Sequence, residues 1–207
     1  MRVFPVTALL GAVLFFTGCG FNKSDPYQLK IQAAKEFSQS DYRQAVKTLT
    51  MCLSRVEKNR SPEKLSNGYF CARELGRAHV ALNQPNEAIL AYRAALNYKQ
   101  LITLRYGKHR FREFGPESLV ELATVYRKQG KSFEAAEFYQ QALRSVSKEE
   151  PTHLIVYRDA WSGLGLAYEK LGLTQDAKIA FSNAQKIGGN SNAASTLIKR
   201  KERLTNE

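Results

Sequence analysis

The sequence predicts an all-α fold: an α-solenoid of about four helical hairpins followed by a C-terminal capping helix. Two observations predict it. Apolar and small residues recur three, four and seven positions apart, which places them on one face of a helix. The same pattern of two paired helices then returns along residues 26–187. Because one such hairpin cannot bury its own apolar face, we expect the copies to stack on one another.

The clearest hairpin lies in residues 158–187. Gly172 separates its two helices, and a glycine that can adopt a positive φ is predicted to end the first of them. Thr174 follows as the predicted N-cap of the second helix. The large and small residues that define the pattern are Trp161, Leu164, Gly165, Tyr168, Ala177, Phe181 and Ala184.

The same positions recur upstream. Residues 116–147 hold Leu119, Leu122, Ala123, Tyr126, Ala135, Tyr139 and Ala142, and residues 69–100 hold Ala72, Leu75, Gly76, His79, Ala88, Tyr92 and Ala95. A fainter copy in residues 26–59 keeps Leu29, Ala33, Ala45 and Leu49. That copy has Gln32 and Glu36 where apolar residues are expected, which suits a terminal repeat with solvent on one side.

This pattern resembles the tetratricopeptide repeat, whose helices carry Trp, Leu-Gly and Tyr, then Ala, Phe and Ala. The repeats here are longer than the usual roughly 34 residues, and the stretch from Glu121-Leu122-Ala123 to Gln140-Gln141-Ala142-Leu143 is similar to the long repeats of kinesin light chains. The resemblance covers about residues 26–187. It implies a protein-binding scaffold whose first helices line a concave groove.

Proline and capping residues predict where the helices begin. Asp25-Pro26 and Ser61-Pro62 each pair a capping side chain with a proline at the first helical position. The predicted helices are 26–39, 41–59, 62–82 and 85–106, and Pro116 and Pro151 open the third and fourth hairpins. Residues 188–207 are predicted to be a capping helix and tail, because a helix over 192–204 would have one apolar and one basic side. A helix lying on a membrane surface is the alternative.

The N-terminus predicts export. Residues 1–18 combine a positive start, an apolar stretch too short to span a bilayer and a small-residue end, as a secretory signal peptide does. The ending resembles the bacterial lipobox, with Phe16 where leucine is usual, and implies that Cys19 is acylated. Residues 19–25 would then be a tether. Gly20 is not the aspartate that resembles an inner-membrane retention signal of enteric bacteria, so the resemblance implies an anchor in the outer membrane, facing the periplasm. The alternative is an ordinary signal peptide with an incidental cysteine.

The chain carries a formal net charge of +12, so an anionic partner is expected. Export argues against nucleic acid as the partner, and anionic lipid, an acidic protein or the cell-wall polymer explains the positive charge better. Arg105, Lys108, Arg110 and Arg112 form a basic insert between the second and third hairpins, interleaved with aromatic residues. This insert is either a contact for an anionic partner or a solvated loop whose phenylalanines fill the gap between hairpins.

Cys52 and Cys71 remain once Cys19 is assigned to the lipid. The resemblance places them on helices that pack together, and the periplasm is oxidising. Two alternatives stay open: a disulfide bond between Cys52 and Cys71, or two buried free thiols.

The sequence holds no catalytic constellation. The three histidines are scattered, no metal-ligand spacing occurs, and no glycine-rich phosphate loop is present. Ser61-Pro62-Glu63-Lys64 fits a Ser-x-x-Lys pattern, but its partner motifs are missing and a helix cap explains the serine. We therefore expect no enzyme, no cofactor and no metal site.

The resemblance places five candidate contacts in the groove: Phe37, Phe70, Arg73, Arg77 and Arg127. A basic and aromatic groove suits a peptide that carries carboxylates and one or two apolar anchors; the alternative is that these are ordinary solvated residues. The sequence thus predicts a lipid-anchored adaptor or assembly factor of the bacterial envelope, whose protein partner it does not name. Direct binding of cell-wall polymer or an anionic membrane through the insert and tail is the alternative function.

Overall fold

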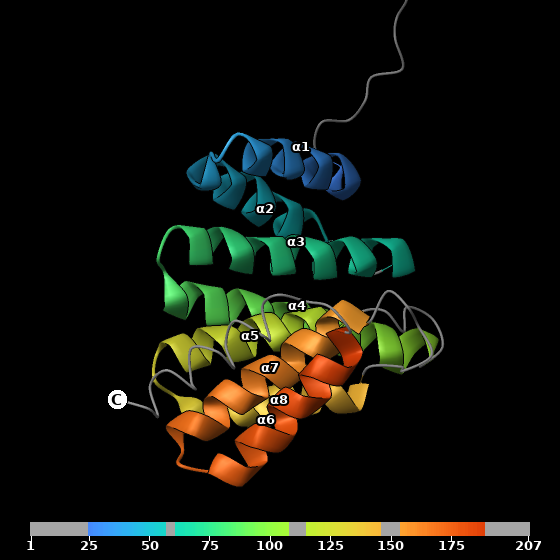
Figure 1. Cartoon of the computed structure of the whole chain (residues 1–207). Helices are drawn as coiled ribbons and strands as arrows, with labels where there is room; N and C mark the ends of the chain where they lie inside the picture. The colour runs from blue at the N-terminus through green and yellow to red at the C-terminus, as the bar shows by residue number, and fades with distance from the viewer. Residues whose placement is uncertain (1–24, 57–60, 108–114, 146–153, 189–207) are drawn as a thin grey trace, which may run out of the picture.

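The computed structural model describes residues 25–56, 61–107, 115–145 and 154–188, which form eight α-helices (Figure 1). This confirms the predicted all-α class. The signal peptide, Cys19, Lys108, Arg110, Arg112 and the predicted capping helix lie outside the described residues. The helices are α1 Pro26–Ser38, α2 Tyr42–Val56, α3 Pro62–Ala81, α4 Pro85–Tyr106, α5 Pro116–Lys128, α6 Ser132–Ser145, α7 Leu154–Lys170 and α8 Thr174–Gly188.

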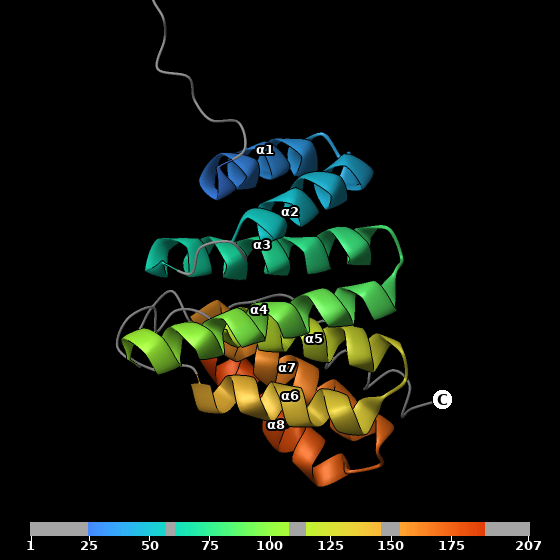
Figure 2. The same cartoon turned by 180° about the vertical axis from the view of Figure 1, so that it is seen from behind.

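Consecutive helices pair into four hairpins, and the hairpins stack along one axis (Figures 1 and 2). Each second helix packs on the first helix of the next hairpin, as α2 does on α3, α4 on α5 and α6 on α7. Among the odd-numbered helices, α1 also contacts α3, and α5 also contacts α7. The even-numbered helices of the described chain make no comparable contacts with one another. The odd-numbered helices therefore form the inner layer of a curved solenoid.

The four hairpin turns share one backbone conformation. Ser40, Asn83, Gly130 and Gly172 have φ values of 58°, 56°, 78° and 76° at equivalent positions. The backbone N–H of the next residue then donates a hydrogen bond to a carbonyl of the preceding helix, as Leu173 N does to Tyr168 O at 2.9 Å. The break predicted at Gly172 is confirmed, but the N-cap predicted at Thr174 is wrong by one residue. Thr174 is already helical, and the Leu173 carbonyl accepts the first bond, from Ala177 N at 3.0 Å.

The helix starts predicted from Asp25-Pro26 and Ser61-Pro62 are confirmed. The Asp25 carboxylate accepts a hydrogen bond from Tyr27 N at 3.0 Å, and the Ser61 hydroxyl accepts one from Lys64 N at 3.4 Å. Each proline occupies the first helical position, where it has no N–H to leave unpaired.

Small residues in the first helices allow aromatic rings of the second helices to approach closely. A Cβ placed on Gly76 would lie 2.6 Å from Tyr92 Cε1, and one placed on Gly165 would lie 2.6 Å from Phe181 Cε1. Real Cβ contacts are never so short, so only glycine fits these two sites with the rings in place. The signature Gly-and-aromatic pairs are thus direct packing partners.

Gly165→Val should lower the free energy of unfolding by about 2 kcal/mol, because its methyl groups would overpack against the Phe181 ring. Urea unfolding measures the change. Adding Phe181→Leu should recover part of the lost stability by making room. A single variant as stable as the parent would show that the ring does not press on this glycine.

Two hairpin junctions each contain a hydrogen bond to a tyrosine hydroxyl. Arg93 Nη2 on α4 donates to the Tyr126 hydroxyl on α5 at 2.8 Å. Gln140 Nε2 on α6 donates to the Tyr168 hydroxyl on α7, also at 2.8 Å. These pairs occupy equivalent positions in successive repeats, so each ties one hairpin to the next.

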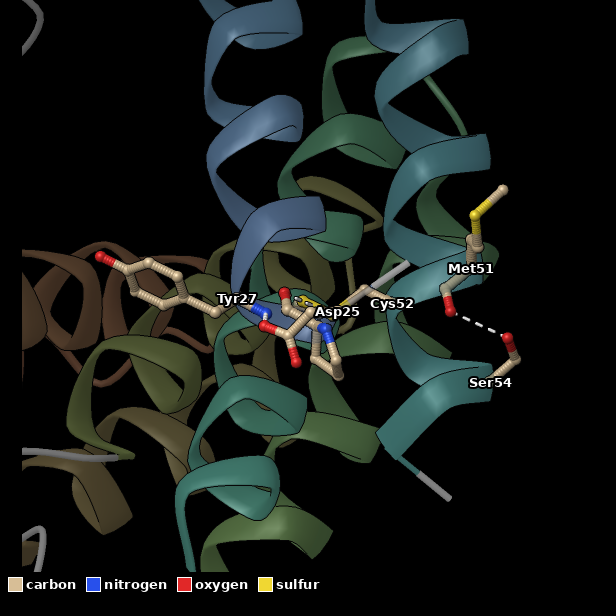
Figure 3. The surroundings of a disulfide bond; sticks show 7 residues. Asp25, Tyr27, Met51, Cys52 and Ser54 are labelled. Atoms are coloured by element: carbon tan, nitrogen blue, oxygen red, sulfur yellow. Dashed lines mark hydrogen bonds between the residues drawn. A yellow bond between two sulfur atoms is a disulfide. The ribbon is translucent and has the colours of Figure 1, made fainter. Parts of the chain in front are cut away.

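The first junction is built differently. His79 takes the tyrosine position there, and its Nδ1 lies 2.8 Å from Gln84 Oε1 in its own hairpin. A disulfide between Cys52 on α2 and Cys71 on α3 joins the two hairpins instead, with a Cα–Cα distance of 6.4 Å (Figure 3). Of the two alternatives that the sequence left open, the structure contains the disulfide.

Candidate docking site on the inner layer

A hollow of about 390 Å3 lies on the inner layer, where the first three hairpins meet. We call it the docking hollow. Its apolar and aromatic walls are Phe37, Tyr42, Val80, Ala81, Tyr92, Val120 and Val125, and the Thr124 side chain also lines it. Its charged lining residues are Arg77, Glu121 and Lys128. The volume falls in the range of small binding sites and is large enough to take side chains of a peptide.

The first hairpin supplies an aromatic wall of the hollow. Phe37 lies in the last turn of α1, and the turn at Ser40 folds the chain back so that Tyr42 opens α2. The two rings meet edge to face, with their centroids 5.5 Å apart. This wall therefore depends on how the first hairpin sits against α3.

Four charged side chains form a cluster beside the hollow: Arg73, Glu74, Arg77 and Glu121. Arg73 donates two hydrogen bonds of 3.0 Å to the Glu121 carboxylate, from α3 to α5. Arg77 donates to Glu74 at 3.1 Å, and its Nε lies 3.9 Å from Glu121. Two positive and two negative groups cancel, so this part of the groove is less basic than its arginines alone suggest.

Within this cluster, Arg73 and Glu121 bind each other and link α3 to α5. Burial raises the pKa of the Glu121 carboxyl, and the hydrogen bonds and charge of Arg73 act against that rise. Arg77 differs because half of its side chain is exposed. Arg77 can therefore reach a partner, whereas Arg73 is occupied by Glu121.

The remaining groove candidates lie outside the hollow. Lys30 Nζ lies 4.8 Å from the centroid of the Phe70 ring and 5.1 Å from that of Tyr27, so these three residues form a separate group near the start of α1. Arg127 is half-buried on α5, and its Nε has no hydrogen-bond partner among the described residues. The structure thus brings Phe37 and Arg77 together in one site and places Phe70 and Arg127 elsewhere.

Of the basic insert, the structure describes only Arg105. Arg105 lies in the last turn of α4 and lines a second hollow of about 220 Å3 with Leu65, Leu101 and Leu104. Leu104 is 75% exposed. Lys108, Arg110 and Arg112, on which the predicted anionic contact depends, fall outside the described residues.

Among the described residues, no group of three histidine, cysteine, aspartate or glutamate side chains is placed to hold a metal ion. None of the described helices has the length and apolar character needed to cross a bilayer.

Comparison with known proteins identifies the repeat. A family model of the tetratricopeptide repeat matches residues 118–153, which include most of α5 and all of α6. The fold is a tetratricopeptide-repeat (TPR) solenoid. A search of curated protein sequences finds no match.

Solved structures agree with the TPR fold. MamA superposes with a TM-score of 0.58 at 18% identity, covering 81% of both chains. BtubC (BKLC) from P. vanneervenii gives 0.62 at 18% identity, over 81% of this chain and 64% of that one. Kinesin light chain TPR-like repeats from Podosopora anserina give 0.57 at 20% identity, over 81% and 77%. These identities show the fold alone.

The sequence prediction missed part of this TPR groove. Tyr42 and Tyr92 belong to second helices, whereas the prediction considered first helices only. Lys128 follows the predicted Arg127 by one residue and lines the hollow in its place. A signal for Tyr42 was present, since an aromatic residue opens α2 directly after the turn that follows Phe37.

Proposed function

We propose that this TPR protein is a lipid-anchored adaptor of the bacterial envelope that holds an extended segment of a partner protein in the docking hollow. The docking hollow carries the proposal, because it combines apolar walls with exposed cationic groups. The TPR fold supports a protein as the partner. The predicted acylation of Cys19 supports the anchor and the envelope location, with the outer membrane, facing the periplasm, as the proposed site.

The lining of the hollow defines the partner's chemistry. Val80 is 38% exposed and, with Val120 and the aromatic wall, can receive one or two apolar side chains. Arg77 and Lys128 are exposed and can donate charge-assisted hydrogen bonds to a carboxylate on the same segment. We therefore expect a peptide with an apolar residue close to an acidic residue or a C-terminal carboxylate.

Affinity capture from crosslinked cells tests the site. Val80→Asp should abolish capture of the partner, because it places a carboxylate among the apolar walls. The matched control is Leu90→Asp on α4, since Leu90 is 69% exposed and does not line the hollow. Equal capture by both variants would remove the hollow from the proposal.

Cys19→Ala should abolish incorporation of an alkyne-tagged palmitate analogue into the protein, because the acylated thiol is gone. In-gel fluorescence after coupling to a dye measures it, and Cys52→Ala should leave the label unchanged. A labelled Cys19→Ala protein would contradict the lipid anchor.

A second candidate function is direct binding to an anionic membrane surface or the cell-wall polymer. The outer face of α2 favours it, because Arg43, Lys47, Met51 and Arg55 are all exposed on one side of a helix that has no acidic residue. Sedimentation with phosphatidylglycerol vesicles tests this function. Charge-driven binding should weaken steeply by about 0.5 M salt, where screening is nearly complete, while capture through the apolar hollow should persist.

A further inference from the structure

The disulfide lies at the junction that also forms the docking hollow. We propose that formation of the Cys52–Cys71 bond completes the hollow, so that the chain becomes competent to bind its partner only after oxidation. The statement about binding rests on the proposed function.

The first junction lacks the hydrogen bond that ties the other hairpins together. At the later junctions Arg93 and Gln140 donate to tyrosine hydroxyls of the next hairpin. The equivalent donor position on α2 holds Thr50, whose hydroxyl bonds to Val46 O of its own helix at 2.8 Å. The equivalent acceptor position holds His79, which pairs with Gln84. Neither side chain bridges the hairpins.

The core of the first hairpin also contains a buried carboxyl group. Glu36 and Thr48 are 7% and 3% exposed, and Thr48 Oγ1 donates to Glu36 Oε1 at 2.9 Å. The other carboxyl oxygen of Glu36 is buried with no partner among the described residues. A buried polar atom without a partner destabilises the folded state. The hairpin therefore depends on contacts from outside itself.

The disulfide supplies such a contact at the centre of this core. Cys52 and Cys71 are both fully buried, and Cys52 Sγ lies 3.6 Å from Pro26 O at the start of α1 (Figure 3). The bond thus ties α2 to α3 directly beneath α1. Its sequence separation of 19 residues closes a loop that favours the docked state by about 100-fold over the open chain.

Docking of the first hairpin decides whether the hollow has its aromatic wall. Phe37 and Tyr42 belong to that hairpin, whereas Val80, Tyr92 and Val120 belong to α3, α4 and α5. If α1 and α2 separate from α3, the apolar side of the hollow opens to solvent. The partner segment then loses one face of its contact.

The redox step is a thiol–disulfide exchange. The Cys52 and Cys71 thiols lose two protons and two electrons to a disulfide-bearing oxidant, whose disulfide becomes a dithiol. The oxidant must reach the thiols before α1 covers them, because both sulfurs are buried in the folded chain. The same burial shields the finished bond from reductants, so oxidation makes a lasting change in the hollow.

Hydrogen–deuterium exchange of the full chain tests the first step. In Cys52→Ala/Cys71→Ala, amides of α1 and α2 should exchange about 100-fold faster than in the oxidised parent, while those of α5 to α8 stay unchanged. Unchanged protection in α1 and α2 would overturn the inference.

A rescue variant separates the junction from simple loss of packing. Adding Thr50→Gln and His79→Tyr to the cysteine-free chain recreates the Gln140–Tyr168 bond and should recover about two- to tenfold of the lost protection. The control Thr50→Gln with His79→Phe has no hydroxyl and should recover less. Equal recovery by both would contradict the role given to the missing hydrogen bond.

Partner capture tests the second step and separates it from the proposed function. The cysteine-free chain and Val80→Asp should both lose the captured protein. If Val80→Asp blocks capture and the cysteine-free chain does not, the inference is wrong and the hollow remains the binding site. If neither change blocks capture, the proposed function itself is wrong.

Discussion

Tyr69→Ala is expected to lower the free energy of unfolding by about 3 to 5 kcal/mol, as for other buried aromatic residues. Tyr69 on α3 is 1% exposed and packs against Leu65 and Ile102. Its hydroxyl accepts hydrogen bonds from Gly115 N at 2.9 Å and from Ser118 Oγ at 3.1 Å, at the start of α5. The substitution therefore removes core volume and a bond between hairpins together. Urea unfolding followed by circular dichroism measures the loss.

Tyr69→Phe removes only the hydroxyl. It should lower the free energy of unfolding by about 1 to 3 kcal/mol, because Gly115 N and Ser118 Oγ lose a buried partner. Burial raises the pKa of Tyr69 from 10.0 to about 12. The neutral phenol is thus favoured in the folded chain, and the contribution of Tyr69 is complete below pH 10 and lost as pH rises toward 12. The stability difference between the parent and Tyr69→Phe should shrink over that range. A constant difference would contradict the burial of the hydroxyl.

Glu121→Lys should destabilise the chain by about 2 kcal/mol. The substitution places a third cation beside Arg73 and Arg77 and leaves Arg73 without its carboxylate. Breaking a buried ion pair costs about 3 to 5 kcal/mol, and the expected value is smaller because 21% of the Arg73 side chain and 24% of the Glu121 side chain are exposed. Urea unfolding is again the measurement.

A charge swap is the control for this pair. Arg73→Glu combined with Glu121→Arg keeps one cation and one carboxylate across α3 and α5, and should recover most of the stability. Glu137→Lys on the exposed side of α6 should change stability by less than about 0.5 kcal/mol. If Glu121→Lys is as mild as Glu137→Lys, the link between the second and third hairpins is solvated and contributes little.

The fold could be predicted from the sequence, because the pattern that defines the repeat lies within single hairpins. Spacing within one hairpin fixes which residues face each other, as with Gly165 and Phe181, and the pattern recurs in each copy. The helix starts at Pro26 and Pro62 and the turns at Gly130 and Gly172 also follow from nearby residues. Ser40 and Asn83 have the same positive φ, but these turns contain no glycine from which the sequence could predict it.

The site was less predictable, because it depends on contacts between hairpins. The sequence counted Arg73 as a free positive charge, but its carboxylate partner, Glu121, lies 48 residues away. The junction of the first two hairpins shows the same limit. Sequence spacing marks His79 as an exception to the tyrosine pattern, yet only the folded chain shows that a disulfide replaces the missing bond.

Photo-crosslinking in living cells tests the central claim most directly. A photoreactive amino acid placed at Val80 points into the docking hollow, and the same residue at Leu90 lies outside it. We predict that light produces one adduct with an envelope protein from position 80 and none from position 90. Absence of an adduct at position 80, or the same adducts from both positions, would contradict an adaptor that holds its partner in the hollow.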